Sequence, residues 1–149
     1  MPGKYSLRIL LFFTFFLCLR TAAFAQADAL ERNLWYNEEK TAKIQIYKAT
    51  DGKFYGKIVW LKVPEADGKP KVDKNNPDKN RKNDPLLSLL ILKGFKKDGD
   101  KVYTDGTIYD PKNGKTYSCK ITNKGESLDV RGYVGFSFIG RTTVWTKAD

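Results

Sequence analysis

The residue types that most often carry catalysis are scarce in this chain of 149 residues. It contains no histidine, so neither a histidine-dependent catalytic triad nor a histidine metal site can form. Of its two cysteines, Cys119 alternates with Ser118 and Lys120 and shares a strand face with Tyr117 and Ile121. This pattern predicts a buried, inert thiol in place of a nucleophile.

The stretch over residues 109–117 sets Asp110 near two phenols, where a general base could stand. A turn explains the same residues more simply. Pro111 presets φ, and Asn113 with Gly114 supplies the left-handed positions of a chain reversal. We therefore predict a turn and no catalytic role here.

The remaining acidic residues do not form a convincing metal site or acid pair. Residues 73–80 alternate oxygen donors as a calcium loop does, but they lack its central glycine and terminal glutamate and are interleaved with cations. Glu38 and Glu39 are adjacent, and adjacent side chains in a strand or tight turn diverge. We predict no catalytic residue, no metal and no cofactor, and so no enzymatic activity.

The cysteine, the phenols and the acidic residues must be positioned by the secondary structure of the chain. The sequence consists largely of short runs of β-branched and aromatic residues that are separated by Gly, Asn, Asp and Pro, which is the pattern of β-strands. Turn sequences such as Asp51-Gly52 predict that consecutive strands pair antiparallel. Glycines within the runs favour the bends and close approaches of a small barrel, and closure removes exposed sheet edges. We predict an all-β, eight-stranded antiparallel barrel, with a two-sheet β-sandwich as the alternative. The predicted strands lie near residues 33–36, 42–48, 54–60, 89–96, 101–109, 116–122, 127–134 and 140–146.

The first 25 residues have the pattern of a cleavable signal peptide. Lys4 and Arg8 precede an apolar run over residues 9–19, which is shorter than a membrane-spanning helix, and Ala23-Phe24-Ala25 has the form of a cleavage site. We predict one domain over residues 26–149, periplasmic or secreted, with no transmembrane anchor after cleavage. Cys18 leaves with the signal, so this domain cannot form an internal disulfide.

The domain that remains after cleavage is basic. The chain has 27 basic and 17 acidic residues, of which three basic and no acidic ones lie in the first 25, so 24 and 17 remain and the net charge is +7. The lysines are spread over nearly every turn, and export separates the protein from nucleic acid, so we predict no nucleic-acid binding. The charge favours loose, salt-sensitive attraction to an anionic envelope surface.

One connection is much longer than the others. Residues 62–84 contain seven basic residues, five acidic residues and three prolines, with almost no apolar side chains. Such a segment predicts a long surface loop, either a solvated insertion or a binding segment.

A series of short motifs runs in order along the chain. They are FYGKIVW at residues 54–60, DPLL at 84–87, GTIYDP at 106–111, NGKTY at 113–117 and GRTTVW at 140–145. In order and spacing they resemble the DUF2147 family of exported bacterial proteins. The resemblance implies a lipocalin-like barrel with no established activity. It also implies that Arg141 packs over Trp35 and closes one barrel end through a cation–π contact worth about 1 kcal/mol.

These observations favour a noncatalytic barrel that holds a small apolar or amphipathic ligand. The rival is a structural or protein-interaction module of the cell envelope whose barrel is filled by its own side chains, and cavity volume separates the two. An enzyme would need carboxylates and phenols converging at one barrel mouth. The ligand-binding candidates, placed inside the barrel by alternation or as a polar contact, are Phe54, Ile58, Trp60, Phe95, Tyr117 and Arg131.

Overall fold

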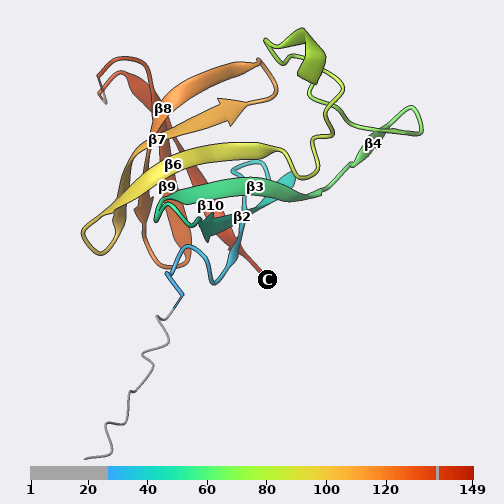
Figure 1. Ribbon diagram of the computed structural model, residues 1–149. Helices are drawn as coiled ribbons and strands as arrows, with labels where there is room; N and C mark the ends of the chain where they lie inside the picture. The colour runs from blue at the N-terminus through green and yellow to red at the C-terminus, as the bar shows by residue number, and fades with distance from the viewer. Residues whose placement is uncertain (1–26, 137) are drawn as a thin grey trace, which may run out of the picture.

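The computed structural model describes residues 27–136 and 138–149 (Figure 1). The predicted signal peptide lies outside the described residues. A hairpin of β4 (Glu65–Ala66) and β5 (Lys69–Pro70) and a 3-10 turn, η1 (Lys79–Arg81), lie within the long connection over residues 62–84. The strands of the barrel are β1 (Leu34–Tyr36), β2 (Ala42–Lys48), β3 (Phe54–Leu61), β6 (Leu90–Asp98), β7 (Val102–Asp110), β8 (Lys115–Asn123), β9 (Ser127–Tyr133) and β10 (Gly140–Ala148).

The eight strands close into one barrel in the order β1-β10-β9-β8-β7-β6-β3-β2, with every neighbouring pair antiparallel. The short strand β1 closes the sheet, because Trp35 lies opposite Lys147 of β10 on one side and Ile44 of β2 on the other. The antiparallel barrel is therefore confirmed, and the two-sheet alternative is wrong. Closure gives each of the eight barrel strands two partners and removes the exposed edges of this sheet.

One half of the barrel interior is filled by large side chains. Trp35, Phe95 and Tyr103 are buried, and the rings of Phe54 and Tyr103 meet edge to face with centroids 5.1 Å apart. The turn that precedes β1 plugs this end, since the Trp35 indole donates a hydrogen bond of 3.0 Å to the carbonyl of Leu30. Packing of these large side chains therefore stabilises this half of the barrel.

Two glycines permit the closest approaches within this packed half. A Cβ atom on Gly106 would lie 2.4 Å from the ring of Phe95, and one on Gly56 would lie 2.8 Å from Leu92. The strand register shifts beside both glycines. These positions bend the sheet tightly enough to close, as glycines within small barrels do.

A β-bulge reverses the faces of β3 near its end. Ile44 lies opposite Ile58 whereas Lys43 lies opposite Trp60, so Val59 is an extra residue on β3. Beyond the bulge, Leu61 lines the interior and Trp60 lies on the outside, 38% exposed and edge to face with Tyr36. The predicted inward orientation of Trp60 is wrong, because strict alternation cannot anticipate the extra residue.

Residues 62–89 fold back against the barrel. Val72 and Pro85 form an isolated antiparallel bridge, and Asp73 is fully buried although the segment is strongly polar. The Asn75 amide donates to the carbonyls of Pro111 and Lys112 at 3.0 and 2.9 Å, which joins this segment to the β7–β8 turn.

Within the described part of the chain, no helix is long and apolar enough to cross a membrane.

Candidate functional site: a cavity at the open end of the barrel

The half of the barrel opposite the plugged end is hollow. It contains a cavity of about 930 Å³ that is walled by inward-facing residues of most barrel strands. Lys62, Val63, Lys71 and Leu86 of the long segment line one side of its opening. The apolar residues of the wall include Ile44, Ile58, Leu61, Ile91, Ile108 and Val130.

The sizes of the inward-facing side chains explain why one half is packed and the other hollow. Aromatic rings fill the packed half, whereas Ala42, Gly132 and Thr143 occupy inward positions around the cavity. A barrel of eight strands is just wide enough for large side chains to fill it. Small and medium residues at the same radius leave a void.

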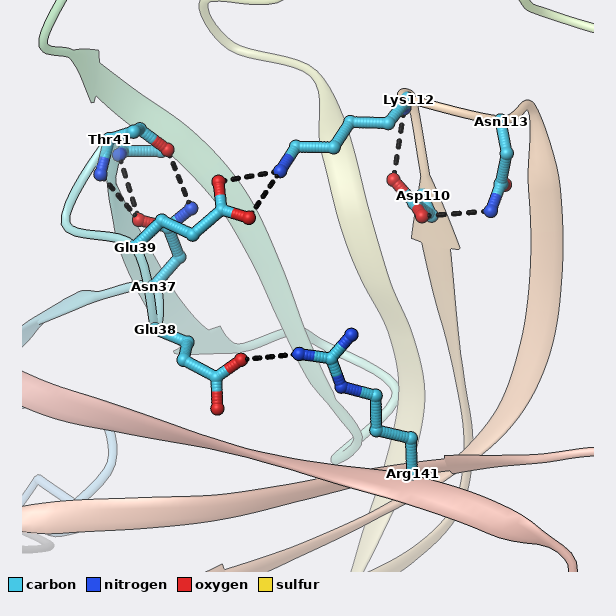
Figure 2. Close-up of polar contacts among 9 residues, drawn as sticks. Asn37, Glu38, Glu39, Thr41, Asp110, Lys112, Asn113 and Arg141 are labelled. Carbon is cyan, nitrogen blue, oxygen red and sulfur yellow. Dashed lines mark hydrogen bonds and ion pairs between the residues drawn. The ribbon is translucent and has the colours of Figure 1, made fainter.

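Two ion pairs lie at the rim of the cavity (Figure 2). The Arg141 guanidinium at the start of β10 lies 2.8 Å from Glu38, and Lys112 of the β7–β8 turn contacts both carboxylate oxygens of Glu39 at 2.7 and 2.5 Å. The Glu38 and Glu39 side chains diverge, as predicted. Hydrogen bonding to Lys112 and its charge lower the pKa of Glu39. The two adjacent carboxylates therefore bind cations from two other parts of the barrel, the β7–β8 turn and the start of β10.

The turn between β1 and β2 is built to present these two glutamates. The side-chain oxygen of Asn37 accepts hydrogen bonds from the N–H groups of Thr41 and Ala42 at 2.8 and 3.0 Å (Figure 2). An asparagine that bonds its own backbone in this way fixes a turn. The glutamates between these anchors then project toward the cavity rim.

The β7–β8 connection is the predicted reversal. One Asp110 oxygen accepts from the Lys112 N–H and the other from the Asn113 amide, both at 2.9 Å (Figure 2). Gly114 adopts a left-handed φ of +71°, whereas Asn113, which was also predicted to be left-handed, does not have a positive φ. The carboxylate of Asp110 holds the turn that aims Lys112 across the rim, so the turn prediction is confirmed.

A buried hydrogen bond fixes the long segment beside the cavity. The Tyr109 hydroxyl donates to Asp73 at 2.8 Å, and the Asn76 amide donates to the other oxygen of Asp73 at 2.7 Å. Burial, then this hydrogen bond and the charge of Asp73, raise the pKa of Tyr109 to about 12. Tyr109 therefore stays protonated as a donor under ordinary conditions.

The structure separates the six predicted ligand-binding residues into three groups. Ile58 and Tyr117 line the cavity. Phe54 and Phe95 point inward but belong to the packed half. Trp60 lies outside the barrel because of the β-bulge, and Arg131, the remaining candidate, lies outside because side chains alternate along β9.

That remaining candidate is Arg131. Its predicted role as a polar contact for a ligand in the barrel is wrong. Its neighbour Val130 faces the cavity, so Arg131 faces out. It donates to the Thr142 hydroxyl at 3.0 Å and to the Phe138 carbonyl at 3.1 Å. Arg131 thus braces the β9–β10 hairpin from the outer face.

The expected cation–π contact between Arg141 and Trp35 is also wrong. Trp35 lies opposite Lys147 on β10. Arg141 stands six residues earlier on that strand, about 20 Å away along it. The two residues occupy opposite ends of the barrel, and the partner of Arg141 is Glu38. No local sequence signal could have found this pair, because its members are about a hundred positions apart.

The interior placement of Cys119 is confirmed. The thiol is fully buried in the core, and burial raises its pKa to about 12. Among residues 27–136 and 138–149, no group of three or more acidic or cysteine side chains is placed to hold a metal ion. The site therefore offers an apolar chamber with a charged rim.

Comparisons with known proteins agree with this architecture. A family model described as an uncharacterized protein conserved in bacteria (DUF2147) matches residues 33–147. No curated protein sequence matches the chain significantly. A solved structure, titled as protein HP1028 from the human pathogen Helicobacter pylori and as belonging to the lipocalin family, is similar with a TM-score of 0.68 and 22% sequence identity. The match covers 78% of this chain and 82% of that one, and it shows a shared lipocalin-like fold.

Proposed function

The chain belongs to the DUF2147 family of bacterial proteins, and from this premise we propose that it is a noncatalytic binding protein for a small apolar or amphipathic ligand. The signal peptide over residues 1–25, the single domain over residues 26–149 and a periplasmic or extracellular location are parts of the same proposal. The observation that carries it is the cavity of about 930 Å³ in the open half of the barrel.

The volume of the cavity favours a carrier over a filled structural barrel. Pockets that bind small molecules usually measure about 300–1,000 Å³ and are mainly apolar with a few placed polar groups. This cavity lies within that range and has an isoleucine-rich wall. A module that only presents its outer surface has no use for such a void, which costs packing energy.

The rim favours a ligand with one polar end. Arg141 and Lys112 lie at the opening, while Ile108, Val130 and Trp145 lie on the wall. An elongated amphiphile could place its apolar part against the wall and its head group beside these cations. The long segment over residues 62–84 contributes Lys62 and Lys71 to the same opening.

The rim carboxylates give little support to catalysis. Glu38 and Glu39 are held in ion pairs, and Asp110 accepts hydrogen bonds within its own turn. A general acid or base at neutral pH usually needs a pKa shifted toward 7, whereas the pKa of Glu39 is lowered. The phenols of Tyr109 and Tyr117 lie near these groups, but Tyr109 is committed to Asp73.

The test is the binding of a fluorescent apolar probe, N-phenyl-1-naphthylamine, to the protein and to two tryptophan variants. Ile108→Trp fills the cavity and should weaken probe binding at least about tenfold. Val144→Trp adds the same side chain on the outer face of β10, where Val144 is 45% exposed, and should leave binding unchanged. Urea unfolding of each variant checks that it is folded.

Equal probe binding by both variants would contradict the proposal, as would an absence of probe binding by the unaltered protein. Native mass spectrometry of the protein purified from its own envelope fraction gives an independent result. A copurified small molecule supports the carrier. A stoichiometric protein partner would instead favour the interaction module.

A further inference from the structure

The connection between β9 and β10 exposes an unusual concentration of apolar side chains. Val134, Phe136, Phe138 and Ile139 are 66, 70, 76 and 57% exposed. The rings of Phe136 and Phe138 are stacked, with centroids 5.7 Å apart and an interplanar angle of 6°. The connection projects from the end of the barrel (Figure 1). Contiguous exposed apolar groups of this kind mark an interaction surface.

Cationic residues lie near the base of this apolar tip. Arg131 donates to the Phe138 carbonyl, and Lys120 lies opposite Arg131 in the β8–β9 register. Arg141, which is paired with Glu38, begins β10. No acidic residue occurs in the sequence between Asp129 and Asp149. Apolar and aromatic side chains with cations beside them are the pattern of segments that insert into the interface of an anionic bilayer.

The size and shape of the tip favour a bilayer over a protein partner. A stable protein interface needs about 800 Å² and roughly 20–30 residues from each side. The described residues of the connection, 134–136 and 138–139, present far less than that. Insertion into a bilayer interface requires only that a few apolar side chains reach the acyl boundary, while nearby cations contact head groups.

We propose that the tip of the β9–β10 hairpin inserts into membranes rich in anionic phospholipid head groups. Val134 and Ile139 belong both to the tip and to the lining of the cavity mouth. Insertion therefore orients the open end of the barrel toward the bilayer. This membrane docking does not depend on the proposed ligand binding in the cavity. If the protein both docks on the bilayer and binds an amphiphile, the ligand passes between bilayer and barrel without crossing water.

The test measures binding to vesicles of phosphatidylglycerol and phosphatidylethanolamine, and to phosphatidylcholine vesicles, by cosedimentation. It uses protein that begins at Gln26 and so contains every strand of the barrel. The double variant Phe136→Ser with Phe138→Ser should lose binding to the anionic vesicles by at least about tenfold. The control Leu87→Ser removes a comparably apolar side chain, 47% exposed in another loop, and should bind like the unaltered protein.

A second measurement separates insertion from charge attraction alone. Binding of the unaltered protein should fall with added salt and be weak on phosphatidylcholine, because the cations at the base contribute. Unchanged anionic-vesicle binding by the double variant would overturn the proposal, and so would a failure of the unaltered protein to bind. Light scattering tests self-association. If the unaltered protein is a dimer and the double variant is a monomer, the tip is a dimer contact and the proposal is overturned. Probe binding in the cavity is measured without vesicles, so the two proposals can fail separately.

Discussion

The hydroxyl of Tyr109 on β7 donates a 2.8 Å hydrogen bond to the buried carboxylate of Asp73, thirty-six residues earlier in the chain. This contact fastens the segment over residues 62–89 to the barrel beside the cavity. The Asn76 amide donates to the second oxygen of Asp73, so both oxygens of this buried side chain have a hydrogen-bond donor.

Tyr109→Phe should therefore loosen this segment without opening the barrel. Removal of one donor leaves a buried acceptor unsatisfied, which costs about 1–3 kcal/mol. We expect faster amide hydrogen exchange over residues 71–86, measured by mass spectrometry, with little change in β8 and β9. Tyr117→Phe is the control, since its hydroxyl contacts the exposed side chain of Asn113. Equal exchange in the two variants would contradict the role assigned to Tyr109.

Asp28 should make stability depend on pH at the plugged end of the barrel. Burial alone would raise its pKa, but hydrogen bonds from Lys97, Tyr103 and the Leu30 N–H outweigh burial and lower it. A lowered pKa in the folded state stabilises the fold above the unfolded value of about 3.9, and this contribution is lost as the pH falls through the folded value.

The measurement is the free energy of unfolding in urea at pH values from 7 down to 3. The unaltered protein should lose more stability below about pH 4 than Asp28→Asn does, because the variant has no carboxylate to protonate. At pH 7 the variant should be less stable by about 1–3 kcal/mol, because charged hydrogen bonds are lost. Asp100→Asn, in the exposed β6–β7 turn, should behave like the unaltered protein.

Gly106→Ala should destabilise the packed half of the barrel. The added Cβ would lie 2.4 Å from the ring of Phe95, which is fully enclosed and cannot move aside. Overpacking of this kind costs about 1–3 kcal/mol. The control is Gly132→Ala, whose Cβ would meet its nearest neighbour, Ile108, at an ordinary 3.6 Å. Thermal unfolding should show a clear loss for the first variant, and similar midpoints would refute the close-approach argument.

The rim cations should discriminate between ligands by charge. Lys112→Ala combined with Arg141→Ala should weaken displacement of the probe by dodecanoate but not by dodecanol, because only the carboxylate can pair with these residues. The unfolding midpoint should change little, since both ion pairs are solvent-exposed. Lys53→Ala, in the β2–β3 turn, is the control. An equal loss for both ligands would exclude head-group recognition.

Cys119 should resist thiol reagents in the folded protein. Its thiol is buried and its pKa is raised to about 12, so little reactive thiolate forms at pH 8. Reaction with a disulfide reagent should be slow without denaturant and rapid in urea. Rapid reaction of the native protein would show that the packed half opens readily.

The strand pattern and turn chemistry predict eight antiparallel strands and favour a barrel, but they leave a two-sheet sandwich open. Turns rich in Gly, Asn and Asp fix where the chain reverses, and β-branched and aromatic runs fix what lies between them, so both signals are local. Ile58 and Tyr117 were found as cavity residues by the same alternation. The same alternation wrongly predicts that Trp60 faces inward, because one extra residue at Val59 inverts the faces of the residues that follow it on β3.

The sequence by itself determined the eight strands, their antiparallel order and a buried unreactive cysteine, since these depend on neighbours in the chain. Only the tertiary structure decided which half of the barrel is hollow, because that depends on the summed volumes of side chains from strands far apart. Closure likewise decided that Arg141 meets Glu38 and lies at the opposite end from Trp35. The register of β1 against β10 sets those distances, and no local pattern encodes it.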